Sequence, residues 1–294
     1  MFVAMALNLL GMEKRILLPT DFSKNARNAI RFALDLYADR KCSFYFLNVY
    51  DVDGFSIEAS EYRPERGQRS YEIEKRKSEE RLEQLMKDLR PFSNQTKHNF
   101  HAIPSFNTLL EAVKEVIAQK DIDIVIMGTK GITGSRLAIF GTNAINIMDN
   151  VTECPILAIP ENAIFKSPKE IVFPTDYKTP FKRRELKYLM NIAKMHGAFI
   201  RVLHIKQSAN PKNPQQGYKE LLEWILTEVD HSFHELEGIN VQTGINAFID
   251  SRNSDMVAFI NENRGIFKKI LSRSLAKELA YYSKVPILVL KNRA

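Results

Sequence analysis

The chain has 294 residues, of which 45% are hydrophobic and 26% are charged. This balance predicts a globular protein with an apolar core and excludes a disordered or fibrous chain, and the length suits two domains of about 150 residues. The formal net charge is +7. Residues 1–160 contain equal numbers of basic and acidic side chains, so residues 161–294 carry the whole positive excess.

The two cysteines, Cys42 and Cys154, both lie in apolar runs typical of strands. They allow no disulfide framework and no zinc-ligand spacing, so we expect a reducing cytosol and a cytoplasmic protein. Residues 1–11 are apolar, but they are too short to span a membrane, and positive charges follow them rather than precede them as in a secretory signal. We expect the ordered chain to begin at Met12 and to have no membrane partner.

Short apolar runs alternate with stretches of helical periodicity along the first half of the chain. Ser23 is placed to cap the first of these helices. Strands that alternate with helices at this spacing predict right-handed crossovers and a parallel sheet. The predicted strands are 15–23, 42–49, 97–103, 123–127 and 155–159, and the predicted helices are 24–39, 70–90, 109–119 and 143–150.

The same pattern of elements starts again after residue 160. The runs that match are 171–177 with 16–22, 198–205 with 42–49, and 285–290 with 154–159. Paired signatures at both ends of each half indicate a tandem duplication with its joint near residues 161–167. We therefore predict an α/β fold of two tandem, doubly wound, five-stranded parallel-sheet domains, Rossmann-like with strand order 3-2-1-4-5, spanning residues 12–160 and 161–294.

A glycine-rich segment follows the fourth predicted strand. Gly128 ends the apolar run, and nine residues separate Gly131 from Gly141 and Thr142, which open a helix. Glycines let backbone N–H groups approach a phosphate closely, and a helix N-terminus adds partial positive charge. A strand, a glycine loop and a helix start in this order are typical of an anion cradle. A plain glycine-rich turn is the alternative interpretation.

Ligands of a doubly wound sheet bind outside the carboxyl ends of the strands, where the winding direction reverses. If the first strand is central, Asp21 and Gly128 meet at that crevice. Asp21 could then accept hydrogen bonds from a ribose or a base while the glycine segment holds phosphates. An aspartate after a first strand is otherwise often a turn residue, but its pairing with the glycine segment favours a function.

At these residues the sequence resembles the universal stress protein family. The resemblance covers both halves outside residues 1–11, and its most specific part is the spacing Gly128-x-x-Gly131, nine residues, Gly141-Thr142, which is typical of the ATP-binding branch. The runs LPTDFS at 18–23 and CPILAIP at 154–160 agree with the first and last strands of that family.

The resemblance implies that the chain binds one ATP, or another adenine nucleotide, either with or without Mg2+. It assigns Asp21 to the nucleoside, Val49 to a backbone contact, Met127 to the border of the base, and the glycines with Thr142 to the ribose and phosphates. The full implied site comprises Thr20, Asp21, Val49, Met127, Gly128, Gly131, Gly141, Thr142 and Asn143.

The sequence departs from the family pattern in both halves. In the first half, Lys130 and Asn48 stand where family members often have histidine. The second half keeps Asp176, but residues 261–264 lack the glycines of 128–131, and Ser272-Arg273 takes the place of Gly141-Thr142. Residues 245–253 also look too short for a full helix. We therefore expect the second domain to be degenerate and not to bind ATP.

No motif points to catalysis or to a metal. There is no Walker A sequence, no G-x-G-x-x-G and no nucleophile elbow. His231 and His234 could share one helix face, yet no third ligand completes a site. We expect a stress-response or regulatory nucleotide-binding protein that is not an enzyme, with at most weak ATP hydrolysis. The alternatives are an ATP-dependent enzyme of related fold, such as a nucleotidyl transferase or an ATP-pyrophosphate lyase, and a structural module that binds nothing.

Two features concern association. Residues 156–159 and 287–290 are apolar edge candidates, so we predict that the halves pair through their fifth strands as an intramolecular pseudo-dimer, with further oligomerisation left open. The second half also holds a basic group, which is either a solvated surface or a docking surface for an acidic protein partner. No aromatic residues interleave the charges of residues 268–277, so we expect no nucleic acid binding. Its members are Lys182, Arg183, Arg184, Arg264, Lys268, Lys269, Arg273 and Lys277.

Overall fold

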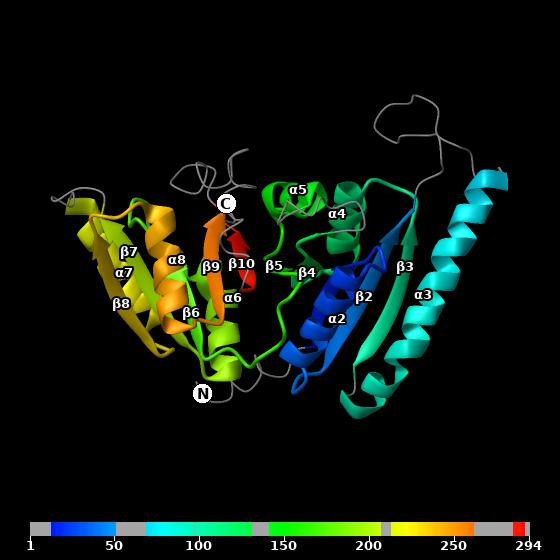
Figure 1. The fold of residues 1–294 in the computed structure, drawn as a ribbon, viewed down its shortest axis with the longest axis horizontal. Helices are drawn as coiled ribbons and strands as arrows, with labels where there is room; N and C mark the ends of the chain where they lie inside the picture. Colours follow the sequence, from blue (N-terminus) through cyan, green and yellow to red (C-terminus); the bar gives the residue numbers. More distant parts are fainter. Residues whose placement is uncertain are drawn as a thin grey trace, which may run out of the picture. The chain divides into compact units, whose positions relative to one another are not determined.

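Strands and helices alternate along the chain, as the sequence predicts (Figure 1). The computed structural model describes residues 13–50, 69–96, 98–130, 141–206, 213–261 and 285–291. The chain divides into two compact units, residues 1–127 and 128–294. No helix in these described ranges combines the length and apolar character that a membrane crossing requires.

The first unit is a parallel sheet covered by helices, with strand order β3-β2-β1-β4. Ser23 caps its first helix, because the Ser23 hydroxyl accepts a hydrogen bond from the Ala26 N–H at 3.1 Å. Its elements are β1 (Lys14–Pro19), α2 (Lys24–Leu36), β2 (Cys42–Val49), α3 (Arg69–Thr96), β3 (Asn99–Ser105), α4 (Leu109–Lys120) and β4 (Ile124–Gly128), whose last residue begins the second unit.

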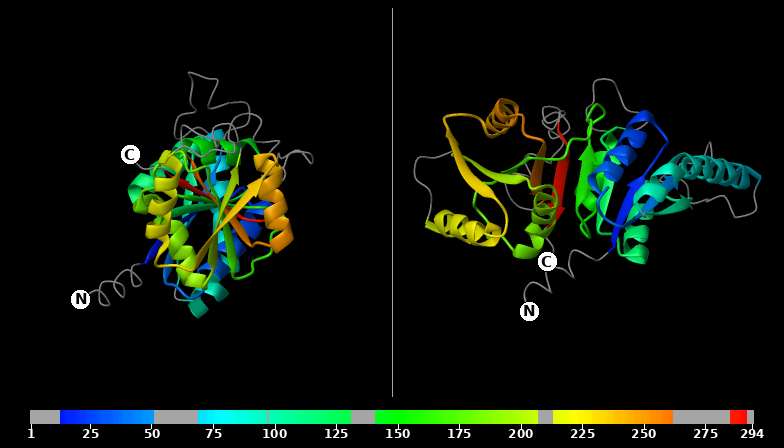
Figure 2. Two further views of the ribbon diagram at one scale, coloured as in Figure 1. Left: turned by 90° about the vertical axis from the view of Figure 1, so that its left-hand side faces the viewer. Right: turned by 90° about the horizontal axis from the view of Figure 1, so that it is seen from below.

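The second unit contains a complete copy of the same topology. Strands β8, β7, β6, β9 and β10 are neighbours in that order and run parallel, which is the predicted order 3-2-1-4-5. Helices α7 and α8 lie on opposite faces of these strands (Figure 2). The elements are α5 (Thr142–Asn150), β5 (Ile156–Ile159), β6 (Glu170–Pro174), α6 (Arg183–His196), β7 (Phe199–Lys206), α7 (Asn213–Leu226), β8 (His231–Glu237), α8 (Val241–Arg252), β9 (Met256–Asn261) and β10 (Ile287–Lys291).

Strand β5 belongs to the first half in sequence and to the second unit in structure. The N–H of Thr129, which follows β4, donates to the carbonyl of Ile159 in β5 at 3.0 Å, so the first half also has the order 3-2-1-4-5. On its other side β5 pairs antiparallel with β10, with Leu157 opposite Leu288. The predicted pairing of the two fifth strands is therefore present. The wider pseudo-dimer and the repeat boundary at residue 160 stay predictions.

One aspartate in each half joins the fourth strand to the first. The Asp123 carboxylate accepts from the N–H of Arg15 at 3.0 Å, and the Asp255 carboxylate accepts from the N–H of Glu170 at 3.0 Å. The registers agree, since Ile16 pairs with Ile124 and Ile171 with Met256. These bonds fix how the residues of the two halves correspond.

Helix α3 is longer than predicted. The sequence interpretation ends this helix at Arg90, and the next residue is a proline, which lacks an N–H and disturbs the turn before it. The helix instead continues through Pro91 to Thr96. The extra turn keeps Phe92 beside Leu34 of α2, where both line one groove. This apolar contact favours continuation of the helix despite the missing hydrogen bond.

The expectation that residues 245–253 cannot form a full helix is wrong. Helix α8 begins at Val241, because the Asn240 side chain accepts from the N–H of Gln242 at 2.9 Å. Its apolar periodicity is weak because Gly244 stands where β7 approaches. A Cβ added at Gly244 would lie 2.7 Å from Cδ1 of Ile205. Glycine at this position therefore allows close packing and hides the helical pattern.

The two histidines considered as a metal pair do not lie on a helix. His231 and His234 belong to strand β8, and residues three apart in a strand point to opposite faces. Within the ranges that the structure describes, no group of three or more histidine, cysteine, aspartate or glutamate side chains could hold a metal ion.

A carboxylate network holds the amino ends of the strands in the second unit. Glu170 accepts from Arg201 Nε at 2.8 Å, from Arg252 Nε at 2.7 Å and from Ser254 Oγ at 2.8 Å. Burial raises the pKa of Glu170, but these hydrogen bonds outweigh it and hold the pKa at about 2.

We predict that Glu170→Gln lowers the free energy of unfolding of the second unit by about 2 kcal/mol at pH 7, because two arginines lose their carboxylate. Since the folded pKa lies below the ordinary value of 4.5, the contribution is present above that pH and is lost as the pH falls through about 2. Urea unfolding followed by the fluorescence of Trp224, the only tryptophan, measures it.

Glu237→Gln is the matched control, because Glu237 is 68% exposed where it pairs with Lys206. Its loss should cost less than about 0.5 kcal/mol. An equal effect of the two substitutions, or an undiminished difference between wild type and Glu170→Gln near pH 2, would contradict this account of the network.

Candidate functional site

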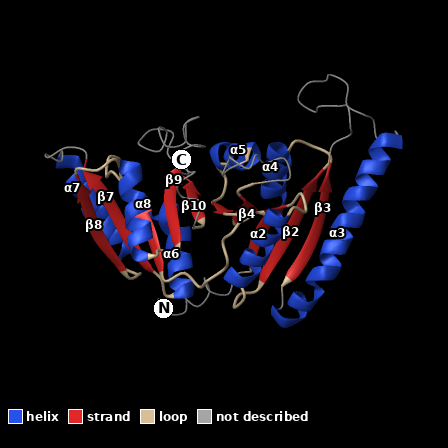
Figure 3. Cartoon of the chain, viewed as in Figure 1, coloured by secondary structure: helices blue, strands red, loops and turns tan. Residues whose placement is uncertain are grey.

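Four of the predicted site residues lie at one edge of the sheet in the first unit. Thr20 and Asp21 follow β1, Val49 ends β2, and Met127 is the penultimate residue of β4. Strand β1 lies between β2 and β4 and runs parallel to both, so the carboxyl ends of the three strands share this edge (Figure 3). The structure therefore brings these four residues to the edge where doubly wound sheets bind ligands.

The turn after β1 is held by a buried chain of hydrogen bonds. The Thr20 hydroxyl accepts from the N–H of Phe22 at 3.0 Å, and Phe22 has a φ of 61°. Asn48 Nδ2 donates to the carbonyl of Thr20 at 2.7 Å, and Ser78 Oγ donates to Asn48 Oδ1 at 2.7 Å. Thr20 thus positions the turn that presents Asp21.

Asp21 acts as a turn residue, which is one of the two interpretations that the sequence allows. Its side-chain Oδ1 accepts from the N–H of Ser23 at 3.0 Å. The backbone carbonyl of Asp21 accepts from the Arg81 guanidinium at 3.4 Å. The side chain is partly exposed at the sheet edge. Its contact with a nucleoside stays a prediction.

The two ends of the glycine segment meet in the second unit. The Thr129 carbonyl accepts from the N–H of Gly141 at 2.7 Å, so the backbone returns to the end of β4 just before helix α5. Lys130, at a position where the family often has histidine, pairs with Glu161 at 3.5 Å. Gly131 lies outside the described residues, so its predicted role is not tested.

Helix α5 begins with an N-terminus that no side chain caps in the described part of the chain. Gly141 is the N-cap, with φ −72° and ψ 154°, and the first turn has no acidic residue. Thr142 and Asn143 are exposed. The first N–H groups of a helix have no acceptor within it, and they carry partial positive charge. This helix start can therefore accept an anion.

Other described helices contrast with α5 at this point. Ser23, Thr108 and Asn240 cap α2, α4 and α8 with side-chain oxygens. In α6, the Glu185 carboxylate accepts from the N–H of Lys182 at 3.1 Å. Where caps are described, the helix after the glycine segment is thus the one without a side-chain acceptor.

The second half lacks the glycine at the end of its fourth strand. Because Asp255 corresponds to Asp123, the residue in the place of Gly128 is Ile260, one position earlier than the sequence comparison placed it. Ile260 is buried, and it carries a branched side chain where Gly128 carries none. The next residue, Asn261, donates to the carbonyl of Met148 at 3.0 Å.

The acidic residue of the second half is engaged by its own turn. Asp176 Oδ1 accepts from the N–H of Lys178 at 3.0 Å, and the Lys178 ammonium lies 3.7 Å from Oδ2. Burial raises the pKa of the adjacent Tyr177 phenol. Asp176 therefore accepts a hydrogen bond from the N–H two residues later, as Asp21 does, but it also has a lysine ammonium nearby.

The predicted basic group is only partly described. Lys182 pairs with Glu185 at 3.7 Å, and Arg183 pairs with Glu228. Lys182 and Arg183 therefore form ion pairs with acidic residues of the second unit. Binding of an acidic partner to the basic group stays a prediction. The members outside the described residues are Arg264, Lys268, Lys269, Arg273 and Lys277.

The sequence interpretation missed the contribution of α3 to the turn. Ser78 is 3% exposed, and Tyr71 and Leu82 of the same helix are buried with it. These residues are seven and four positions apart, which is one helical face. That spacing, and a serine within a run of charges, was the available signal.

Comparison with known proteins identifies the family of the chain. The model of the universal stress protein family matches residues 12–160, which is half of the chain. Two runs of strands in the order 3-2-1-4-5, alternating with helices, define a Rossmann-like class of α/β fold. Within that class, the chain belongs to the universal stress protein family.

Individual relatives agree with this assignment. A universal stress protein of Methanocaldococcus jannaschii is 24% identical over 149 residues, which are 51% of this chain and 83% of that protein. The structure of a universal stress protein from Archaeoglobus fulgidus has a TM-score of 0.66 at 17% identity, over 97% of this chain and 98% of that one. A functionally unknown protein from Pseudomonas aeruginosa has a TM-score of 0.61 at 14% identity, over 97% and 94%. The two solved structures share the fold along nearly the whole chain.

We predict that Asn48→Ala destabilises the first unit by about 1–3 kcal/mol, because the Thr20 carbonyl and the Ser78 hydroxyl lose a buried partner. Asn48→His is the matched control. In the second half, His204 holds the corresponding carbonyl of Thr175 at 2.9 Å, so histidine should preserve the turn. Hydrogen exchange of residues 20–23 measures the effect. Equal protection in Asn48→Ala and wild type would contradict it.

Proposed function

We propose that the chain binds one adenine nucleotide, ATP, and acts as a regulatory nucleotide-binding protein in a stress response. One observation carries the proposal. Helix α5 opens at Gly141 without a side-chain cap and without an acid in its first turn, directly after a glycine segment whose ends are tied by the bond from Gly141 to Thr129. This is the local arrangement that a phosphate requires.

The proposal gives each group of residues one task. Gly128, Gly131, Gly141, Thr142 and Asn143 receive the phosphates and ribose through backbone N–H groups and the Thr142 hydroxyl. Asp21, Val49 and Met127 receive the nucleoside, and Thr20 holds the Asp21 turn. When Mg2+ accompanies the nucleotide, its partners are the phosphates, because the described residues form no metal cluster of their own.

We propose no phosphate-binding site in the second half. Ile260 stands in the place of Gly128, and a branched side chain keeps the backbone away from a phosphate. Asp176 is paired with Lys178. One nucleotide per chain is therefore expected, bound to residues 12–160.

We propose binding rather than catalysis, with at most weak ATP hydrolysis. A transferase or lyase would need a second substrate beside the phosphates, and no described cluster of perturbed acids or bases lies with the predicted site residues. A cytoplasmic location fits the two cysteines, which are both buried thiols. Burial raises the pKa of the Cys42 thiol to about 12, so this cysteine is inert near neutral pH.

We predict that Gly141→Asp weakens ATP binding at least about tenfold while the free energy of unfolding stays equal or rises by a few tenths of a kcal/mol. A carboxylate at the N-cap accepts from the first N–H groups and repels a phosphate. Calorimetric titration with ATP and thermal unfolding measure the two effects.

Gly217→Asp is the matched control, because Gly217 lies in α7 and a Cβ there meets nothing within 4 Å. It should leave ATP affinity unchanged. If Gly141→Asp binds ATP as tightly as the control does, the phosphates are not at the start of α5.

We predict that Asp21→Asn weakens ATP binding about tenfold, because an amide keeps the oxygen that accepts from Ser23 but loses the charge that strengthens hydrogen bonds from ribose hydroxyls. Asp176→Asn makes the same change in the corresponding turn of the second half, where no loss is expected. A loss of equal size in both variants would assign the effect to turn stability or to a second site.

A further inference from the structure

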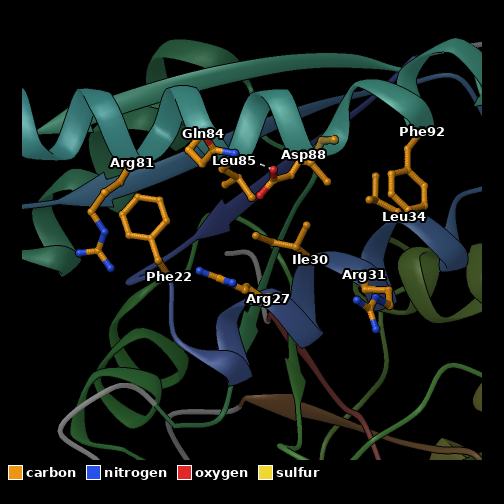
Figure 4. A pocket seen from close by; sticks show the side chains of 11 residues that line it. Phe22, Arg27, Ile30, Arg31, Leu34, Arg81, Gln84, Leu85, Asp88 and Phe92 are labelled. Atoms are coloured by element: carbon orange, nitrogen blue, oxygen red, sulfur yellow. Dashed lines mark hydrogen bonds between the residues drawn. The ribbon is translucent and has the colours of Figure 1, made fainter.

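A groove lies between helices α2 and α3 in the first unit, away from the glycine segment in sequence and formed only by residues 22–92 (Figure 4). Its cavity volume is about 300 Å3, which is at the lower end for small-molecule sites. Six of the lining side chains are apolar: Phe22, Ile30, Leu34, Leu85, Leu89 and Phe92.

The apolar part of the groove is elongated. Ile30 and Leu34 are four residues apart on α2, and Leu85 and Leu89 have the same spacing on α3, so each pair follows its helix axis. Phe92 closes one end and is 40% exposed. Figure 4 shows Phe92 and Leu34 at one end and Phe22 at the other. An elongated apolar strip fits an unbranched hydrocarbon chain.

The polar part of the groove is cationic. Arg27, Arg31 and Arg81 line it against a single carboxylate, Asp88, which accepts from Gln84 at 2.8 Å. None of the three guanidinium groups forms an ion pair with a residue that the structure describes. Asp35 of α2 interacts electrostatically with Arg31, so the excess of positive charge lies at Arg27 and Arg81. An anion from outside the described residues would balance it there.

Two of these arginines flank the Phe22 end. The Arg81 guanidinium carbon lies 4.2 Å from the centre of the Phe22 ring, which orients its planar fork. Arg27 extends from α2 toward the same ring (Figure 4). Guanidinium groups bind carboxylates through paired N–H donors, so this end suits a carboxylate better than a neutral head group.

We propose that the groove binds an organic anion with an unbranched apolar tail, of the class of medium-chain fatty carboxylates. The carboxylate lies between Arg27 and Arg81, and the tail runs along Ile30, Leu34 and Leu85 toward Phe92. This site shares no residue with the one proposed for the adenine nucleotide, since none of the residues assigned to the nucleotide lines the groove.

The test is calorimetric titration of the full chain with sodium decanoate at neutral pH. We expect one decanoate per chain, and an affinity that falls about fourfold for each methylene removed when octanoate and hexanoate replace it. Decanol, which lacks the charge, should bind at least about tenfold more weakly. Hydrogen exchange should show protection in α2 and α3 when decanoate is present.

Matched substitutions locate the site. Arg27→Gln should weaken decanoate binding about tenfold, whereas Arg76→Gln removes the same charge from an exposed pair with Glu80 and should change nothing. Phe92→Ala should weaken binding, whereas Ile73→Ala truncates another exposed apolar residue of α3 outside the groove.

The proposal is overturned if decanoate fails to bind at about 1 mM, a concentration that detects even weak sites. It is equally overturned if the protected segments lie outside α2 and α3. Should a substitution unfold the chain, the chain-length series and the exchange map on wild-type protein still decide the question. Binding of an acidic amphipathic helix in place of decanoate would assign the groove to a protein partner and would also overturn the proposal.

Discussion

A backbone turn at the end of the first strand sets the geometry of both halves. In each half a threonine hydroxyl accepts from the N–H two residues later, at 3.0 Å for Thr20 and 3.1 Å for Thr175. The aromatic residue that follows takes a positive φ, 61° for Phe22 and 51° for Tyr177, a conformation that L side chains rarely adopt. A side chain from the next strand then holds the threonine carbonyl. The strain is kept because several hydrogen bonds oppose its release.

The turn after β1 contributes one residue to the proposed nucleotide site and another to the groove between α2 and α3. Asp21 follows β1 at the sheet edge, while Phe22 forms one end of the groove between α2 and α3. Arg81 contacts both, since it stacks on the Phe22 ring and donates to the Asp21 carbonyl. A ligand that draws Arg81 into the groove would therefore act on the backbone that presents Asp21.

The halves have diverged at the carboxyl edge rather than in the core. The registers of β1 with β4 and of β6 with β9 agree residue by residue, and both first strands are buried. At the end of the fourth strand, however, Gly128 has become Ile260. The register of the sheet is therefore alike in the two halves, whereas the residue that ends the fourth strand differs.

Much of the fold could be predicted because its signals are local. The apolar run 42–49, rich in aromatic residues, predicts a strand, and strand β2 has these bounds. The internal repeat then predicts the strand order of the second half. The polar contacts of Asn48 with Thr20 and Ser78 could not be predicted, since they join residues 28 and 30 positions apart and leave no periodic trace. Helix α8 was missed because a capping asparagine and a packed glycine, rather than an apolar stripe, define it.

The central claim is that one half of the chain binds an adenine nucleotide and the other does not. Native mass spectrometry of the full chain, titrated with ATP to millimolar excess, tests it most directly. The account predicts that one nucleotide adduct saturates and that a second appears only in proportion to free ATP, as nonspecific attachment does. Two adducts of equal affinity, or none at saturation, would contradict it.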